Sequence, residues 1–70
     1  MKQRIIKNQP VRLEFGDYGN FATLIPTKLV ITKPNYHIVR MSYGRNDIRT
    51  IDLCFSLEEV DTASFKGGEI

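Results

Sequence analysis

Turn-forming residues interrupt this 70-residue chain at short intervals, and their spacing limits the folds that it can adopt. Glycine, proline, asparagine and aspartate gather at residues 16–20, 34–35, 44–47 and 67–68, and Pro26 adds a further break. The stretches between these turns have the length of strands and are rich in β-branched and aromatic side chains. We therefore expect a mostly β fold, a small antiparallel barrel or curled sheet of about five strands, which a short C-terminal helix could complete.

The first predicted strands lie before residue 33. Residues 11–15 alternate apolar and charged side chains, which is typical of a strand with one buried face. Residues 21–25 and 27–32 are two further β-prone runs, separated by Pro26. Because proline cannot donate a ladder hydrogen bond, Pro26 marks a strand end, a bulge or an edge. The pattern leaves open whether the two runs form two short strands or one long bent strand.

The clearest predicted hairpin comprises residues 36–43 and 48–55, joined by a loop of residues 44–47. In that register Tyr43 faces Ile48, and the other pairs follow from this one. One face of the hairpin then carries an apolar patch of Tyr36, Ile38, Ile51, Leu53 and Phe55. The other face is mixed and carries His37, Val39, Met41, Tyr43, Ile48, Thr50, Asp52 and Cys54. Apolar residues on both faces predict a strand pair in the middle of a sheet or against a partner.

The pattern changes after this hairpin. Ser56 and Glu59 have the spacing of a capping box, in which the two side chains satisfy amide groups at a helix N-terminus. This spacing predicts a helix of about two turns within residues 57–65. An edge strand through Val60 is the alternative, because β-branched residues are poor helix formers.

The chain is expected to form a single domain, residues 1–70, with residues 1–9 as a flexible arm and residues 66–70 as a frayed tail. So short a chain buries little apolar area, so a homodimer, or a partner that completes the core, is an alternative to a monomer. The first ten residues have no apolar core segment, so we expect no signal peptide and no membrane association. The single cysteine, Cys54, fits a reducing, cytoplasmic compartment.

No residues combine into a catalytic or metal site. One cysteine and one histidine are too few for a closed zinc site and no cofactor motif is present, so we expect neither metal nor cofactor. Cys54 lies opposite His37 in the predicted register, but a thiolate catalyst also needs an oxyanion hole and an orienting third group. Glu58 and Glu59 are adjacent and diverge on a helix, and a lone strand aspartate such as Asp52 usually pairs with a lysine or arginine. We therefore expect a protein that is not an enzyme.

The candidate binding site consists of aromatic and basic residues near the first turn and near the tip of the main hairpin: Tyr18, Phe21, Arg40, Tyr43, Arg45 and Arg49. Tyrosine and arginine are enriched at the hot spots of protein interfaces. Small β-barrels also bind single-stranded nucleic acid with these residues, arginine on phosphates and tyrosine on bases. The plain alternative is that the arginines are simply solvated.

Charge is unevenly distributed along the chain, although the net charge is only +2. Residues 1–50 hold nine basic and three acidic residues, whereas residues 51–70 hold one basic and five acidic residues. A chance distribution of solvated charge is one interpretation. The other is that the basic body attracts an acidic partner, or that one copy pairs head-to-tail with another.

Two functions of different classes fit these features. We favour a small non-enzymatic protein-binding regulator or inhibitor, of the compact kind that phages and other mobile elements encode. The alternative is a nucleic-acid-binding small β-barrel that contacts phosphates with arginine and lysine and bases with tyrosine. The absence of a recognised nucleic-acid-binding motif in the sequence weakens the alternative.

Overall fold

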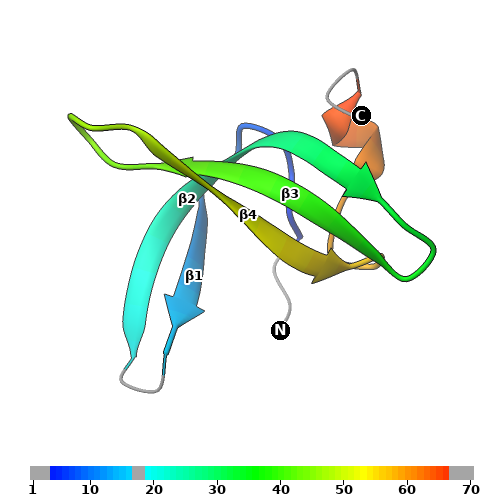
Figure 1. Ribbon diagram of the computed structural model, residues 1–70, viewed down its shortest axis with the longest axis horizontal. Helices are drawn as coiled ribbons and strands as arrows, with labels where there is room; N and C mark the ends of the chain where they lie inside the picture. The colour runs from blue at the N-terminus through cyan, green and yellow to red at the C-terminus, as the bar shows by residue number, and fades with distance from the viewer. Residues whose placement is uncertain (1–3, 17–18, 67–70) are drawn as a thin grey trace.

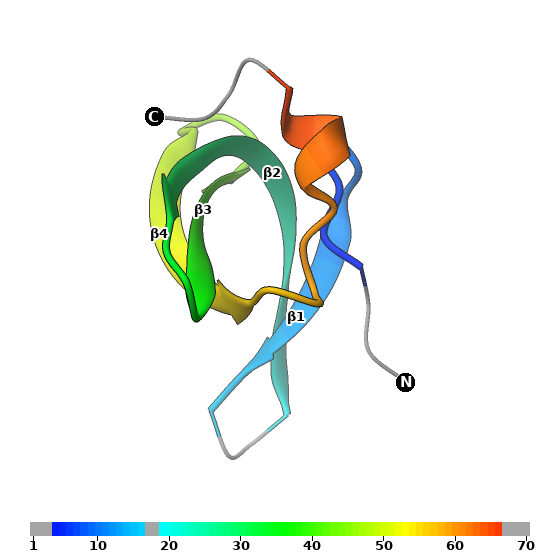
Figure 2. The same cartoon turned by 90° about the vertical axis from the view of Figure 1, so that its right-hand side faces the viewer.

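The computed structural model describes residues 4–16 and 19–66, which form an open, curled antiparallel sheet and one 3₁₀ helix (Figure 1). The elements are β1 (Val11–Phe15), β2 (Asn20–Thr32), β3 (Tyr36–Tyr43), β4 (Arg49–Ser56) and η1 (Thr62–Phe65). The four strands follow chain order in the sheet, and each neighbouring pair is antiparallel. In the view of Figure 2, β2, β3 and β4 curl round without closing into a barrel. The predicted mostly β, curled antiparallel architecture is confirmed.

The two runs around Pro26 form one long bent strand, β2, which is why the sheet has four strands and not five. The first half of β2 pairs with β1 and the second half pairs with β3. Irregularities interrupt the second pairing between Pro26 and Lys28 and between Leu29 and Ile31. Bulges strengthen the local twist, and Pro26 has no N–H to give to a neighbour. Together they allow β2 to change partners and curl.

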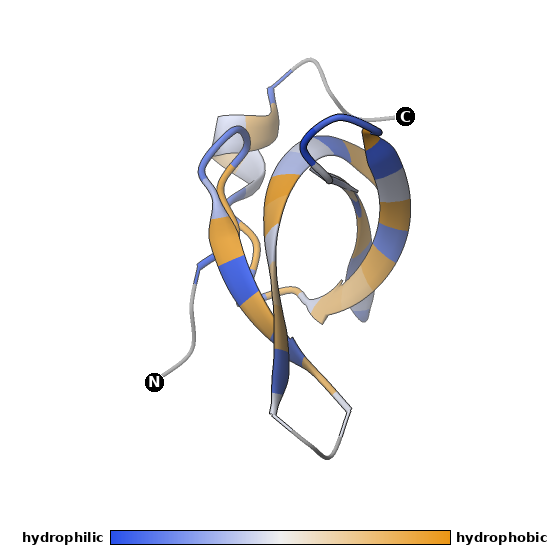
Figure 3. Cartoon of the chain, turned by 90° about the vertical axis from the view of Figure 1, so that its left-hand side faces the viewer, coloured by the Kyte–Doolittle hydropathy of each residue, from blue (hydrophilic) through white to orange (hydrophobic). Residues whose placement is uncertain are grey.

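The core lies inside the curl, and apolar and polar residues alternate along the strands around it (Figure 3). The buried apolar side chains come from β1, β2, β3, η1 and the segments next to them: Ile5, Val11, Leu24, Leu29, Val39, Met41, Val60 and Phe65. Leu53 and Phe55 of β4 are half-buried and pack against this set. Covering the core therefore depends on the segments before β1 and after β4.

Ile5, in the stretch expected to form a flexible arm, belongs to this core. Its N–H donates to the carbonyl of Glu59 at 2.7 Å, and its carbonyl accepts from the N–H of Asp61 at 3.0 Å. These bonds form an isolated parallel bridge between Ile5 and Val60, where an edge strand was the alternative prediction. The segment before β1 is thereby attached to the segment after β4.

The two-turn helix predicted within residues 57–65 does not form. The Ser56 hydroxyl donates to the Glu59 carboxylate at 2.7 Å, but the two residues close a turn instead of capping a helix. The backbone groups of Glu59 and Asp61 bond to Ile5, so they are not available to a helix. The short 3₁₀ helix η1 begins after Asp61, whose carboxylate accepts from a backbone N–H.

Of the tail predicted at residues 66–70, only Lys66 lies within the described part, where it follows η1. Among the described residues, no helix has both the length and the apolar content needed to cross a bilayer.

The β3–β4 hairpin forms as predicted, but its register is shifted by one residue. Tyr43 pairs with Arg49, so the loop contains residues 44–48 and not 44–47. A shift by one residue sends the side chains of one strand to the opposite face. The inner face of β3 therefore carries His37, Val39 and Met41 in place of the predicted Tyr36 and Ile38. The inner face of β4 is the predicted one, with Ile51, Leu53 and Phe55.

The same shift separates Cys54 from His37, so their predicted opposition is wrong. Cys54 pairs with Ile38 and its thiol is exposed, whereas His37 pairs with Phe55 and is 4% exposed. The thiol and the imidazole lie on opposite faces of the sheet. They cannot form a nucleophile and base pair in this arrangement.

The buried imidazole of His37 leads to a stability prediction. Its Nδ1 has no hydrogen-bond partner among the described residues, and an unsatisfied buried polar atom costs about 1–3 kcal/mol. We expect His37→Leu, which is similar in volume and has no polar atoms, to raise the free energy of unfolding by about 1 kcal/mol. Urea unfolding at pH 7 measures this change, with His37→Gln as the variant that keeps polar atoms. An unchanged or lower midpoint for His37→Leu contradicts the prediction.

Candidate functional site

The β1–β2 hairpin and the β3–β4 hairpin diverge and leave a fork in the sheet (Figure 1). Pairing between β2 and β3 begins at Ile25 and Ser42. The part of β2 before Ile25 pairs with β1, and the end of β3 after Ser42 pairs with β4 alone. Tyr43, the last residue of β3, therefore lies where the two hairpins separate.

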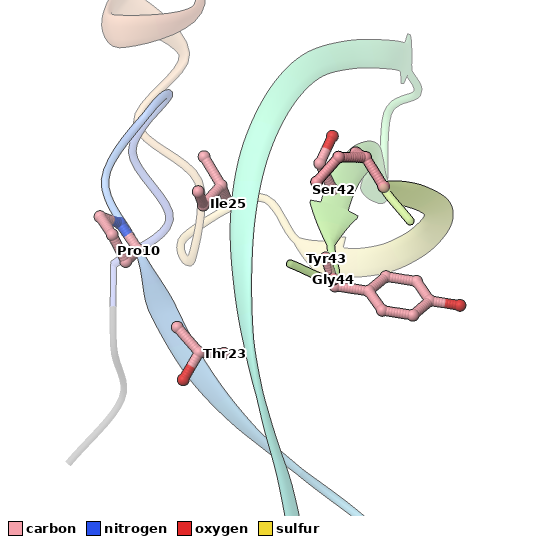
Figure 4. Close-up of a pocket in the computed structure, with 7 residues that line it drawn as sticks. Pro10, Thr23, Ile25, Ser42, Tyr43 and Gly44 are labelled. Atoms are coloured by element: carbon pink, nitrogen blue, oxygen red, sulfur yellow. The ribbon is translucent and has the colours of Figure 1, made fainter. Parts of the chain in front are cut away.

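Two grooves open at the fork, and Tyr43 lines both of them. The first has a volume of about 270 Å³ and is lined by Pro10, Thr23, Ile25, Ser42, Tyr43, Gly44 and Ile48 (Figure 4). The second has a volume of about 220 Å³ and is lined by Phe15, Ala22, Leu24, Tyr43 and Ile51. We call these two cavities the Tyr43 grooves. Their walls come from both hairpins and are mainly apolar.

Four of the seven exposed large apolar residues of the described chain line the Tyr43 grooves. The exposed fractions are 41% for Ile25, 37% for Tyr43, 62% for Ile48 and 36% for Ile51. The other exposed large apolar residues of the described chain lie outside the two walls: Phe21, Ile31 and Leu57. Single exposed apolar residues are ordinary, but several of them in the walls of a groove are typical of binding sites, so these grooves are the candidate site.

The predicted aromatic residues that the structure describes lie in different parts of the fold. Tyr43 lines both grooves, as described above. Phe21 lies on the other hairpin, where the guanidinium of Arg12 sits 4.2 Å from the centre of its ring in a cation–π contact. Tyr18 lies outside the described residues. The predicted aromatic residues that the structure describes thus do not form one cluster.

The predicted arginines are largely engaged by carboxylates of the same chain. Arg40 lies on the outer face of β3, and its Nε and Nη2 donate to the two carboxylate oxygens of Asp52 at 2.9 and 3.1 Å. Arg49 donates from Nε to Oδ2 of Asp47 at 3.2 Å, and its Nη2 lies 3.1 Å from the same oxygen in an ion pair. Arg45 is exposed, and no ion pair within the described part of the chain includes it.

The pair between Arg40 and Asp52 alters the acidity of both groups. The hydrogen bond from Arg40 lowers the pKa of the Asp52 carboxyl, and the hydrogen bond and charge of Asp52 raise the pKa of Arg40. Because folding lowers the pKa of Asp52, the pair stabilises the folded state at pH values above the ordinary carboxyl pKa. This stabilisation is lost as the pH falls through the pKa that Asp52 has in the folded state. Both side chains are about two-fifths exposed, so this contribution is a minor one.

The groove residues Ile25, Ile48 and Ile51 were not predicted as site residues. They belong to different strands and loops, and only the fork between the hairpins brings them together. The available signal was the apolar character of both faces of the hairpin, which predicted a position in the middle of a sheet or against a partner and did not identify these residues.

The chemistry that this site offers is apolar contact with another molecule. Within residues 4–16 and 19–66, no three histidine, cysteine, aspartate or glutamate side chains gather where they could hold one metal ion. Comparisons of the chain with protein-family models, with curated proteins and with solved structures found no match.

Proposed function

We propose that this protein is a small non-enzymatic binding regulator that holds an apolar segment of a partner protein in the Tyr43 grooves. The observation that carries the proposal is that Tyr43 lines two apolar grooves whose walls hold further exposed apolar residues, Ile25 and Ile48 in the first and Ile51 in the second. Burying apolar area contributes roughly 25 cal/mol for each Å² removed from water. A partner segment that fills one of the grooves would therefore gain affinity mainly from side chains that are already exposed there.

The charges beside the grooves suggest the composition of the partner segment. Arg12 pairs with Thr23 across β1 and β2 and so projects from the same face as that groove-lining residue. Arg45 lies in the loop that begins at Gly44, another groove-lining residue. Opposite charge around an apolar contact improves specificity and the rate of association. We therefore expect a partner segment with apolar residues at its centre and acidic residues beside them.

Binding of nucleic acid is the weaker proposal for this surface. Single-stranded nucleic acid needs a basic track for its backbone and exposed aromatic platforms for its bases. Arg40 and Arg49 are each bonded to a carboxylate, and Tyr43 lines apolar grooves. The described residues therefore provide fewer unpaired basic groups for contacts with phosphates than the sequence predicts.

The proposal is tested with peptides selected against the protein from a displayed library of random sequences. We expect the selected peptides to combine apolar and acidic residues and to bind Ile48→Ser and Tyr43→Ala at least about tenfold more weakly, the loss typical of a modest hot spot. Leu57→Ser is the matched control, because Leu57 is also exposed but lies outside the grooves. Fluorescence titration of a labelled peptide measures the affinities, and circular dichroism checks that the variants fold.

Two outcomes would count against this function. Selected peptides that bind Ile48→Ser as well as the parent protein would show that the grooves are not the site. Failure to select any peptide, together with oligonucleotide binding that weakens steeply as salt is raised, would favour the nucleic-acid alternative.

A further inference from the structure

β4 is an outer strand of the sheet, and its free side is unusually open. It pairs with β3 along its whole length without an irregularity. Residues 49–55 make no other backbone hydrogen bond within the described part of the chain. β4 also contains no proline, glycine or lysine. Proteins normally protect outer strands with such residues, with bulges or with a covering segment. This edge is therefore a template for a further strand.

We propose that the strand that pairs with this edge is β4 of a second copy of the same chain. The two β4 strands would run antiparallel about a two-fold axis normal to the sheet and join the two sheets into one. In such a pair, residues that face each other lie on the same face of the sheet, and the residue on the axis faces its own copy. Only a few registers satisfy this condition, and they differ in how well the side chains match.

An axis at Leu53 matches the side chains best. On the inner face, Leu53 then faces Leu53 of the other copy, and Ile51 faces Phe55. On the outer face, Asp52 faces Cys54 and Thr50 faces Ser56, so residues 50–56 of both copies are paired. An axis at Asp52 would instead place two carboxylates opposite each other, and an axis at Ile51 would place Arg49 opposite Leu53. Cross-strand apolar pairs stabilise a sheet, whereas like charges directly opposite destabilise it.

The charge distribution favours the same arrangement. An antiparallel pair of β4 strands brings the loop of residues 44–48 in one copy alongside the segment that follows Ser56 in the other. The loop carries Arg45, which has no ion pair within the described residues, and the segment carries the exposed Glu58. The uneven charge of the chain, basic up to residue 50 and acidic beyond it, thus becomes attractive between copies.

The first test is the molar mass of the wild-type protein in solution. Size-exclusion chromatography with light scattering is expected to give a dimer that dissociates on dilution. A protein that remains monomeric up to about 1 mM would overturn the proposal, because such an affinity is too weak for a specific dimer.

The second test is cross-linking, which reports the register. In a Cys54→Ser background, Leu53→Cys places two cysteines directly opposite each other with Cα atoms about 4.5–5.5 Å apart, within the range that a disulfide spans. Thr50→Cys in the same background is the matched control, because its two copies would lie roughly 20 Å apart along the strands. We expect mild oxidation to link Leu53→Cys and not Thr50→Cys. Equal linking of both variants, or linking of the control alone, would overturn the register.

The third test uses charge at Cys54, which is exposed and faces Asp52 of the other copy in this register. Cys54→Asp places like charges opposite each other twice in the dimer, so we expect its dissociation constant to rise about tenfold. Cys54→Lys places opposite charges there and should dimerise at least as well as the parent. Similar dissociation constants for the two variants would contradict the proposal. Neither substitution changes a residue that lines the Tyr43 grooves, but the dimer pairs Ile51, which lines the second groove. The first groove contains no β4 residue, so peptide binding that depends on Ile48 should be unchanged in both variants, and the two proposals can fail separately.

Discussion

Phe65→Ala is expected to remove about 3–5 kcal/mol from the free energy of unfolding, which is most of the stability of a domain of this size. Phe65 is 1% exposed and is the one residue of η1 that enters the core. Its loss would leave a cavity under the only helical turn of the described chain. Urea unfolding followed by circular dichroism measures the effect.

Thr62→Ala is the matched control for this experiment, because Thr62 lies in the same short helix but is exposed. It should change the stability by no more than about 0.5 kcal/mol. A loss of less than about 1 kcal/mol for Phe65→Ala would mean that η1 does not cover the core in solution.

Gly44→Ala is expected to cost at least about 2 kcal/mol, because it combines backbone strain with a collision. Gly44 has a φ of +107°, and a Cβ there would collide with the carbonyl of Asp47. Gly44 also lines the first of the Tyr43 grooves. Thermal unfolding followed by circular dichroism measures the cost, and the peptide titration should show weaker binding as well.

Gly19→Ala separates the two contributions. Gly19 also has a positive φ, +70°, but nothing lies within 4 Å of a Cβ added there. It should therefore lose only about 1 kcal/mol, the cost of the left-handed conformation for a residue with a side chain. If both glycine variants are equally stable, the loop of residues 44–48 is wider than the structure describes.

The parts of the fold that were predictable from sequence are those that local patterns determine. Val11–Phe15 alternates apolar and charged residues, and the structure gives β1 the same bounds. β3 also has its predicted bounds, and β4 is displaced by one residue. The bend of β2 could not be decided, because it depends on pairing with β1 on one side of Pro26 and with β3 on the other.

The register of the main hairpin was not predictable for a different reason. β3 carries apolar residues on both faces, so Ile38 and Val39 are equally good candidates for the core. Only the length of the loop decides between them, and that length depends on the conformation of Gly44. The predicted helix failed because a contact with Ile5, far away in the sequence, engaged the backbone of Glu59 and Asp61.

The candidate site was predictable only in part. Tyr43 was identified from its type and its position at the end of a strand. Arg40 and Arg49 form ion pairs with residues of the same hairpin, but these pairs could not be predicted without the correct register. The isoleucines of the grooves come together only because the two hairpins diverge. A site formed by the divergence of two hairpins leaves no motif in the sequence.

The bridge between Ile5 and Val60 bears on how this protein folds during its synthesis. Arg4 and Glu58 beside it are separated by 54 positions and are joined by a further hydrogen bond of 3.5 Å, so the two segments meet only after most of the chain has been made. Distant pairings of this kind slow folding, because the entropy of a large loop is lost before the contact is gained. During synthesis, the β2–β3–β4 meander would therefore emerge with an uncovered interior, and the structure would be completed only after the segment that contains Val60 and Phe65 has emerged as well.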